Sequence, residues 1–220
     1  MLKRSTWTTP TGLCDPTPEE SKLTQPITVL KNAHLGETMW VVGTGPSLRF
    51  LQARHFGPGP VVLVNRAINH VRNLALPNML YSMQKDGGDK ARCPNCGQNC
   101  NNHINLPPPG VPLLLHNRES EHCFPNWRPR YMMDVEKDFG YHWFLFSIAV
   151  CACLAKMMGC ARMVYLCCDS MRGDMRTYIP YYDGTATLVE RDQNYVQMPG
   201  QLTSLLEKLS MPAKFIYPEE

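Results

Sequence analysis

Short apolar runs of β-type residues alternate with helical segments along most of the chain. Five runs are typical of strands: residues 39–42, 61–64, 78–83, 161–168 and 213–217. Four segments are typical of helices: residues 47–55, 67–74, 144–158 and 201–209. The four consecutive apolar residues at 61–64 favour a parallel strand covered on both faces. This alternation predicts an α/β fold, a Rossmann-like doubly wound and mostly parallel sheet with helices on both faces.

The length of 220 residues suits one such domain with a small insert. Residues 1–36 are expected to form an N-terminal arm, and residues 37–220 the nucleotide- or donor-binding domain. A net charge of +3 is too weak to require a nucleic acid or a membrane surface as partner. No apolar run is long enough to span a membrane, and no signal peptide is visible, so we expect a cytoplasmic protein. Its ten cysteines are therefore expected to be reduced.

Glycine or polar residues follow four of the expected strands. They are Gly43, Asn65, Asp86 and Asp169. Because the carboxyl ends of parallel strands meet at one edge of the sheet, these four positions are expected to converge there. Ligands of open α/β sheets bind beyond that edge, so the sequence predicts a binding site at it.

The first of these strand ends carries the turn Gly43-Thr44-Gly45-Pro46-Ser47. Glycines let the backbone approach a ligand, and exposed N–H groups at a helix start attract phosphate. A tight turn without any ligand is an equal alternative, because the third glycine of the dinucleotide fingerprint is absent. The sequence also lacks a Gly-Lys-Ser/Thr motif, which excludes a P-loop.

Residues 87–130 interrupt the alternation and contain a cluster of cysteines and histidines. Cys93 and Cys96 form a Cys-x2-Cys knuckle followed by Gly97, a pattern that suits tetrahedral zinc. The compact set of four ligands is Cys93, Cys96, Cys100 and His103, and the fourth ligand is alternatively His116, His122 or Cys123. We expect a small zinc-binding insert in which a structural Zn²⁺ holds the segment together; the alternative is a set of free cysteines in a loop.

Residues 39–48 resemble the Gly-x-Gly-Pro-Ser-Leu signature that two related groups of proteins share. One is a phage and bacterial family linked to 6-hydroxymethylpterin diphosphokinase-like domains, and the other is the bacterial sialyltransferase family. Three further segments resemble later motifs in the same order: residues 62–67, 81–86 and 154–169. The resemblance runs from Trp40 to Tyr217 without the insert.

The resemblance implies a set of binding residues for a nucleotide or a nucleotide-activated donor. They are Gly43, Thr44, Gly45, Pro46 and Ser47 in the first turn, Asn65 and Arg66 after the second strand, Ser147, Asp169, Tyr178 and Tyr182. In the sialyltransferases, tyrosines in the corresponding loop hold the donor phosphates. Asp169 suits ribose hydroxyls or a divalent ion, Mg²⁺ or Mn²⁺, and its alternative is a helix cap or turn former.

The sialyltransferases also use a histidine in this part of the chain as base, whereas the last histidine here is His142. A carboxylate must therefore take that role, and Asp174 and Asp183 are candidates. We expect a nucleotide-sugar-dependent glycosyltransferase with Asp169, Asp86 and Asp174 as its catalytic carboxylates. The acceptor would be a glycan, or a hydroxymethylated base in phage DNA inside an infected bacterial host.

Two alternatives to the glycosyltransferase remain open, and the second belongs to another class of protein. The first is a diphosphokinase-like transferase that uses ATP and magnesium held by Asp86, Asp89 and Asp169. The second is a non-catalytic, zinc-containing module that binds nucleic acid. The weak net charge disfavours the second, because phosphate contacts dominate such binding.

Overall fold

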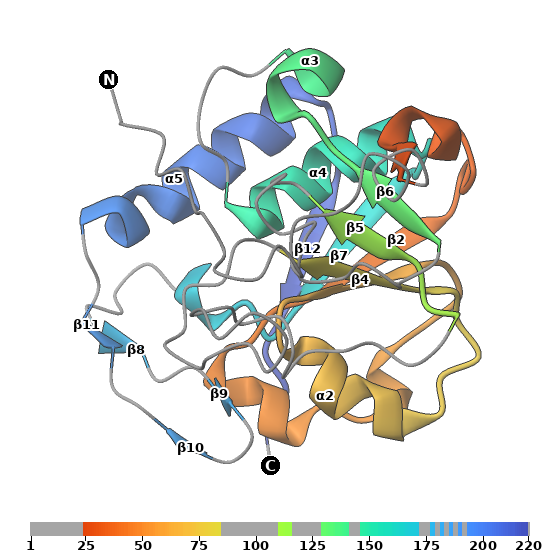
Figure 1. The fold of residues 1–220 in the computed structure, drawn as a ribbon. Coiled ribbons are helices and arrows are strands. Elements are labelled where there is room, and N and C mark those ends of the chain that lie inside the picture. Colours follow the sequence, from red (N-terminus) through yellow and green to blue (C-terminus); the bar gives the residue numbers. More distant parts are fainter. Residues whose placement is uncertain are drawn as a thin grey trace, which may run out of the picture.

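A computed structural model describes residues 24–84, 110–115, 129–140, 146–171, 177–178, 181–182, 185–186, 189–190 and 193–219. Its centre is an eight-stranded sheet with the order β1-β6-β5-β4-β3-β2-β7-β12, in which every pair is parallel. This confirms the predicted Rossmann-like α/β fold (Figure 1).

The strands of this sheet are β1 (Gln25–Pro26), β2 (Thr38–Val42), β3 (Val61–Val64), β4 (Leu80–Gln84), β5 (Leu113–Leu115), β6 (Arg130–Met132), β7 (Arg162–Leu166) and β12 (Ala213–Ile216). Two antiparallel ribbons lie outside it, formed by β8 (Thr177–Tyr178) with β11 (Val189–Glu190) and by β9 (Tyr181–Tyr182) with β10 (Thr185–Ala186). The α-helices are α2 (Ala67–Val71), α3 (Val135–Phe139), α4 (Ser147–Met157) and α5 (Gln193–Lys208). The 3-10 helices are η1 (Ile27–Leu30), η2 (Pro46–Phe50), η3 (Ala53–His55), η4 (Arg72–Leu74) and η7 (Asp169–Met171).

Helices cover both faces of the sheet, as a doubly wound fold requires. α4 and α5 pack on one face, where Ala152 and Leu202 belong to the same core as Val41 and Tyr165 of the strands. α2 and η2 pack on the opposite face, where they form a second core. Figure 1 shows the two layers, with α4 and α5 on one side of the strands and α2 on the other. Strand side chains alternate between these two cores because successive residues point to opposite faces.

The order of the strands reverses at β2. From β2 the chain adds β3, β4, β5 and β6 on one side, and then returns to add β7 and β12 on the other side. Such a topological switch point opens a crevice between the carboxyl ends of two neighbouring strands, which is where ligands bind in open α/β sheets. In this chain those two strands are β2 and β7.

The segment 47–55 differs from its prediction, because it forms two short 3-10 helices rather than one helix. Leu48 and Leu51 are both buried in the same core, and their spacing of three residues matches the three residues per turn of a 3-10 helix. Leu51 itself has an extended backbone that ends η2.

Three further features of the chain concern α5, the end of α4 and β5. α5 begins earlier than the expected start at residue 201. Gly159 has a positive φ of 78° just after α4, a conformation typical of a glycine that ends a helix. β5 lies inside the segment 87–130 and is a member of the main sheet, between β4 and β6.

In the parts of the chain that the structure describes, no helix has both the length and the apolar character needed to cross a membrane.

Candidate functional site

The turn after β2 is bound to the end of β7 at the switch point. The amide of Gly43 donates to the carbonyl of Leu166 over 2.8 Å, and the amide of Gly45 donates to the carbonyl of Cys167 over 2.9 Å. The ladder between β2 and β7 thus continues beyond the strands themselves. It brings the predicted site residues Gly43, Gly45 and Asp169 into one cluster.

Both glycines of the turn are required by this packing. A Cβ atom on Gly43 would lie 2.7 Å from the carbonyl oxygen of Cys167 and 2.9 Å from Sγ of Cys168. A Cβ atom on Gly45 would collide with the carboxylate of Asp169. The sequence suggested that the glycines make room for a ligand, whereas in the structure they make room for the end of β7.

Ser47 and Asp169 join the two sides of the switch point. The Ser47 hydroxyl donates to Oδ2 of Asp169 over 2.6 Å, and the Ser47 amide donates to the same oxygen over 3.3 Å. Both residues are buried. Asp169 therefore holds the first turn of η2 in place from a distant part of the chain.

Few backbone amides of this turn remain for a phosphate. Those of Gly43, Gly45 and Ser47 already donate to β7 and to Asp169, and Pro46 has no N–H group. Among the described residues, the amide of Thr44 is the one in the turn without an intramolecular acceptor. The turn is thus rigid and is not a cradle of free donors.

The carboxyl ends of β3 and β4 are also tied together. Asn65, which follows β3, has a positive φ of 49°, a conformation that asparagine tolerates better than most residues. Its amide donates to the carbonyl of Met83 over 2.8 Å, and its carbonyl accepts from Nε2 of Gln84 over 3.1 Å. The predicted site residue Asn65 thus lies at the same edge as the glycine turn, one strand further along the sheet.

Gln84, at the end of β4, has a buried acceptor that no other described residue uses. Its Nε2 donates to the carbonyl of Asn65 and, over 2.9 Å, to Oγ of Ser82, and the orientation of the amide is fixed because the Asn65 carbonyl can only accept. Its Oε1 is buried and has no hydrogen-bond partner among the described residues. An unpaired buried acceptor costs about 1–3 kcal/mol, and a donor group brought within reach of Oε1 would relieve that cost.

Sequence reasoning did not select Gln84. The sequence did contain a pattern that indicates a special role for Gln84, because Ser82 and Gln84 are polar residues at alternate positions of an otherwise apolar strand. Alternate positions share one face, and both side chains are fully buried on it.

Four other predicted binding residues lie in or beside further elements. Ser147 is the first residue of α4, which leads into β7, and it is buried. Arg66 directly precedes α2 and is half-buried. The backbone of β9, which contains Tyr182, lies against η2 after the glycine turn. Tyr178 lies in β8, the partner of β11.

The cysteines at the switch point are protonated thiols. Burial raises the pKa of Cys167 to about 12 and raises the pKa of Cys168 well above its ordinary value. The same cause raises the pKa of Cys153 to about 12. All five described cysteines are buried and free, as expected for reduced thiols. None of these thiols is a nucleophile at neutral pH, because the thiolate is the reactive form.

Several predicted residues lie outside the described parts of the chain. They are Asp86, Asp89, Asp174, Asp183 and all the candidate zinc ligands, Cys93, Cys96, Cys100, His103, His116, His122 and Cys123. Within the described ranges, no three histidine, cysteine or acidic side chains are grouped so as to hold a metal ion.

Comparison with known proteins adds no relative to this picture. No protein-family model, no curated protein and no solved structure matches the chain. The resemblance to the Gly-x-Gly-Pro-Ser-Leu proteins therefore stays a prediction from residues 39–48 and the motifs that follow them.

Proposed function

We propose that this protein is a nucleotide-sugar-dependent glycosyltransferase that binds its donor at the carboxyl edge of the sheet. The observation that carries the proposal is the switch point between β2 and β7, because the predicted turn and Asp169 meet there. Open α/β sheets bind their ligands at such a point, which supports a nucleotide in this crevice.

The donor's nucleobase is proposed to contact the ends of β3 and β4. Gln84 Oε1 offers an acceptor to an exocyclic amine or a ring N–H, and Asn65 and Arg66 follow the neighbouring strand. Satisfying a buried acceptor that is otherwise unpaired stabilises the complex relative to the free protein. A base with an N–H donor is therefore favoured over a ligand that offers acceptors alone.

The chemistry would rest on positioning the acceptor and on neutralising the departing nucleotide phosphate. Tyr178 and Tyr182 are proposed as hydrogen-bond donors to that phosphate, with Mg²⁺ or Mn²⁺ as a further source of positive charge. Because Asp169 already holds Ser47, we assign it to positioning the turn. The role of base then falls to Asp86, Asp174 or Asp183, and the acceptor is a glycan or a hydroxymethylated base in DNA.

A thermal-shift panel tests the binding step, since a ligand that binds only the folded state raises the melting temperature. Diphosphates of uridine, cytidine, guanosine and adenosine, their sugar conjugates, ATP with magnesium, and duplex DNA are compared. Stabilisation by one nucleoside diphosphate and its sugar conjugate supports the proposal. Stabilisation by ATP with magnesium alone favours the diphosphokinase-like alternative, and stabilisation by DNA alone favours the nucleic-acid-binding module.

Mass spectrometry of products then tests the reaction with the donor that binds. A sugar mass added to a glycan or to hydroxymethylated DNA identifies the acceptor. Donor hydrolysis without transfer to any acceptor in the panel would contradict the assignment as a transferase to these acceptors.

The proposed structural zinc has a separate test. Metal analysis of the purified protein should give one zinc per chain, and Cys93→Ser should remove it. A zinc content well below one per chain that Cys93→Ser does not change would refute the site.

A further inference from the structure

A cavity of about 650 Å³ lies at the amino edge of the sheet, opposite the proposed donor site. Its lining comes from the segments that precede three neighbouring strands: His34 and Glu37 before β2, Gly59 before β3 and Asn78 before β4. Apolar side chains form most of its wall: Phe56, Pro58, Pro60, Leu76, Pro77 and Met79. The volume is in the range of about 300–1,000 Å³ that small-molecule sites have.

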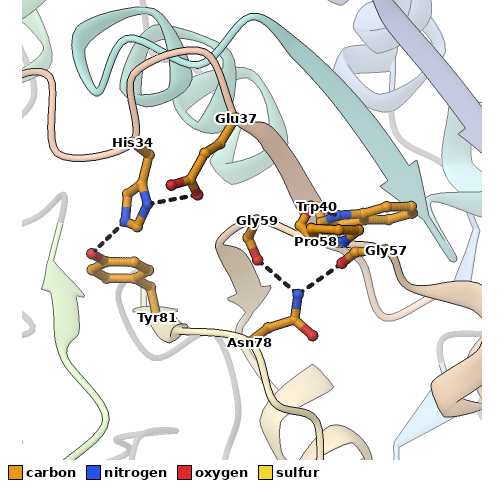
Figure 2. Close-up of polar contacts among 8 residues, drawn as sticks. All are labelled: His34, Glu37, Trp40, Gly57, Pro58, Gly59, Asn78 and Tyr81. Carbon is orange, nitrogen blue, oxygen red and sulfur yellow. Dashed lines mark hydrogen bonds and ion pairs between the residues drawn. The ribbon is translucent and has the colours of Figure 1, made fainter.

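Hydrogen bonds hold one wall of this cavity in place. Nδ2 of Asn78 donates to the carbonyls of Gly57 and Gly59 over 2.8 and 2.7 Å, and the indole N–H of Trp40 donates to the carbonyl of Pro58 over 3.0 Å (Figure 2). Gly59 has a positive φ of 117°, and a Cβ atom there would collide with the backbone of Thr38. The wall is therefore rigid before any ligand arrives, which lowers the entropic cost of binding.

The polar end of the cavity is a chain of three side chains. Nδ1 of His34 lies 3.1 Å from Oε2 of Glu37, and Nε2 of His34 lies 2.9 Å from the hydroxyl of Tyr81 (Figure 2). Burial raises the pKa of Tyr81 to about 12, so the phenol keeps its proton in this hydrogen bond with His34. Both ring nitrogens of His34 are thus engaged within the protein.

The unused charge at this end is the carboxylate of Glu37. Its side chain is 47% exposed, and only Oε2 is bound to His34. The described residues that line the cavity include no lysine and no arginine. The side-chain donors of His34 and Asn78 are already bound within the protein, so Glu37 offers an acceptor with negative charge to a ligand.

We propose that this cavity binds a small organic amine, with its hydrocarbon or aromatic body against the proline-rich wall and its ammonium group on Glu37. An ammonium group has three donors and no acceptor, which matches a lone carboxylate at the end of an apolar cavity. The site is independent of the proposed transferase, because it lies at the other edge of the sheet and uses none of its residues.

NMR titration with three probes of matched shape tests the site. Benzylammonium, benzyl alcohol and benzoate are added while the indole N–H signal of Trp40 is followed, since that group is bonded to the cavity wall. The signal is assigned by its loss in Trp40→Phe. Benzylammonium should cause a saturable shift, benzyl alcohol should bind about two- to fivefold more weakly, and benzoate should bind more weakly still, as expected for a partly exposed ion pair.

The variant Glu37→Gln tests how much the negative charge of Glu37 contributes to binding of the ammonium group. It should bind benzylammonium about two- to fivefold more weakly and should leave the affinity for benzyl alcohol unchanged. Glu207→Gln, the same change on α5 outside the cavity, should leave both affinities as they are. Equal binding of all three probes, no effect of Glu37→Gln, or no response of Trp40 to any probe would each overturn the proposal.

Discussion

The hydroxyl of Ser47 donates to the carboxylate of Asp169 over 2.6 Å, although 122 residues separate them in the chain. Ser47 follows β2 and Asp169 follows β7, so this hydrogen bond joins the two sides of the switch point. The pair is buried, and the Ser47 amide strengthens it by donating to the same oxygen. The shape of the proposed donor site thus depends on a contact within the protein.

Ser47→Ala should lower the free energy of unfolding by about 1.5–3 kcal/mol, because a buried carboxylate loses a hydrogen bond. Urea unfolding measures the change. Ser204→Ala, on an exposed position of α5, is the matched control and should change stability by less than about 0.5 kcal/mol. Equal effects of the two variants would mean that the Ser47–Asp169 contact contributes nothing to stability.

Gly45→Ala should destabilise the protein by about 1–3 kcal/mol, since the added methyl group collides with Asp169 in a packed site. Gly200→Ala should have the opposite effect on stability. Gly200 lies in α5 with no atom within 4 Å of an added Cβ, so alanine there should stabilise the helix by about 0.5–1 kcal/mol. The melting temperatures of the two variants should therefore move in opposite directions, and a gain in stability from Gly45→Ala would rule out the close packing described above.

Most of the sheet could be predicted from the sequence, because local patterns determine it. The apolar run Val61–Val64 forms β3 with the predicted bounds, and the apolar helix before Gly159 is present as α4. The contacts at the switch point could not be predicted in the same way. Gly45 is a glycine because of Asp169, and only the three-dimensional packing of β2 against β7 brings the two together.

The buried thiols predict a loss of stability in alkaline solution. Burial raises the pKa of Cys153 from its ordinary value of 9.0 to about 12, so the folded protein keeps a proton that the unfolded chain releases above pH 9. The stabilisation is complete below pH 9 and is lost as the pH rises toward 12. Between pH 9 and 10 this thiol should account for a loss of about 1 kcal/mol.

Urea unfolding of the protein and of Cys153→Ala at pH 7, 9 and 10 isolates that contribution. The variant should lose less stability than the parent between pH 9 and 10, by about 1 kcal/mol. Identical pH dependence in both proteins would mean that the Cys153 thiol ionises equally easily in the folded and unfolded chain.

Gln84→Met tests whether the buried acceptor at the end of β4 serves a ligand. The variant loses the two hydrogen bonds donated to Asn65 and Ser82 but also removes the unpaired oxygen, so the changes offset to within about 1 kcal/mol of stability. Affinity for the nucleoside diphosphate that most stabilises the protein should fall about five- to tenfold, as the loss of one hydrogen bond predicts. Ser82→Ala keeps the Gln84 oxygen and should leave that affinity unchanged. A loss of stability above about 3 kcal/mol in Gln84→Met with unchanged affinity would mean that the side chain serves the fold, and not the ligand.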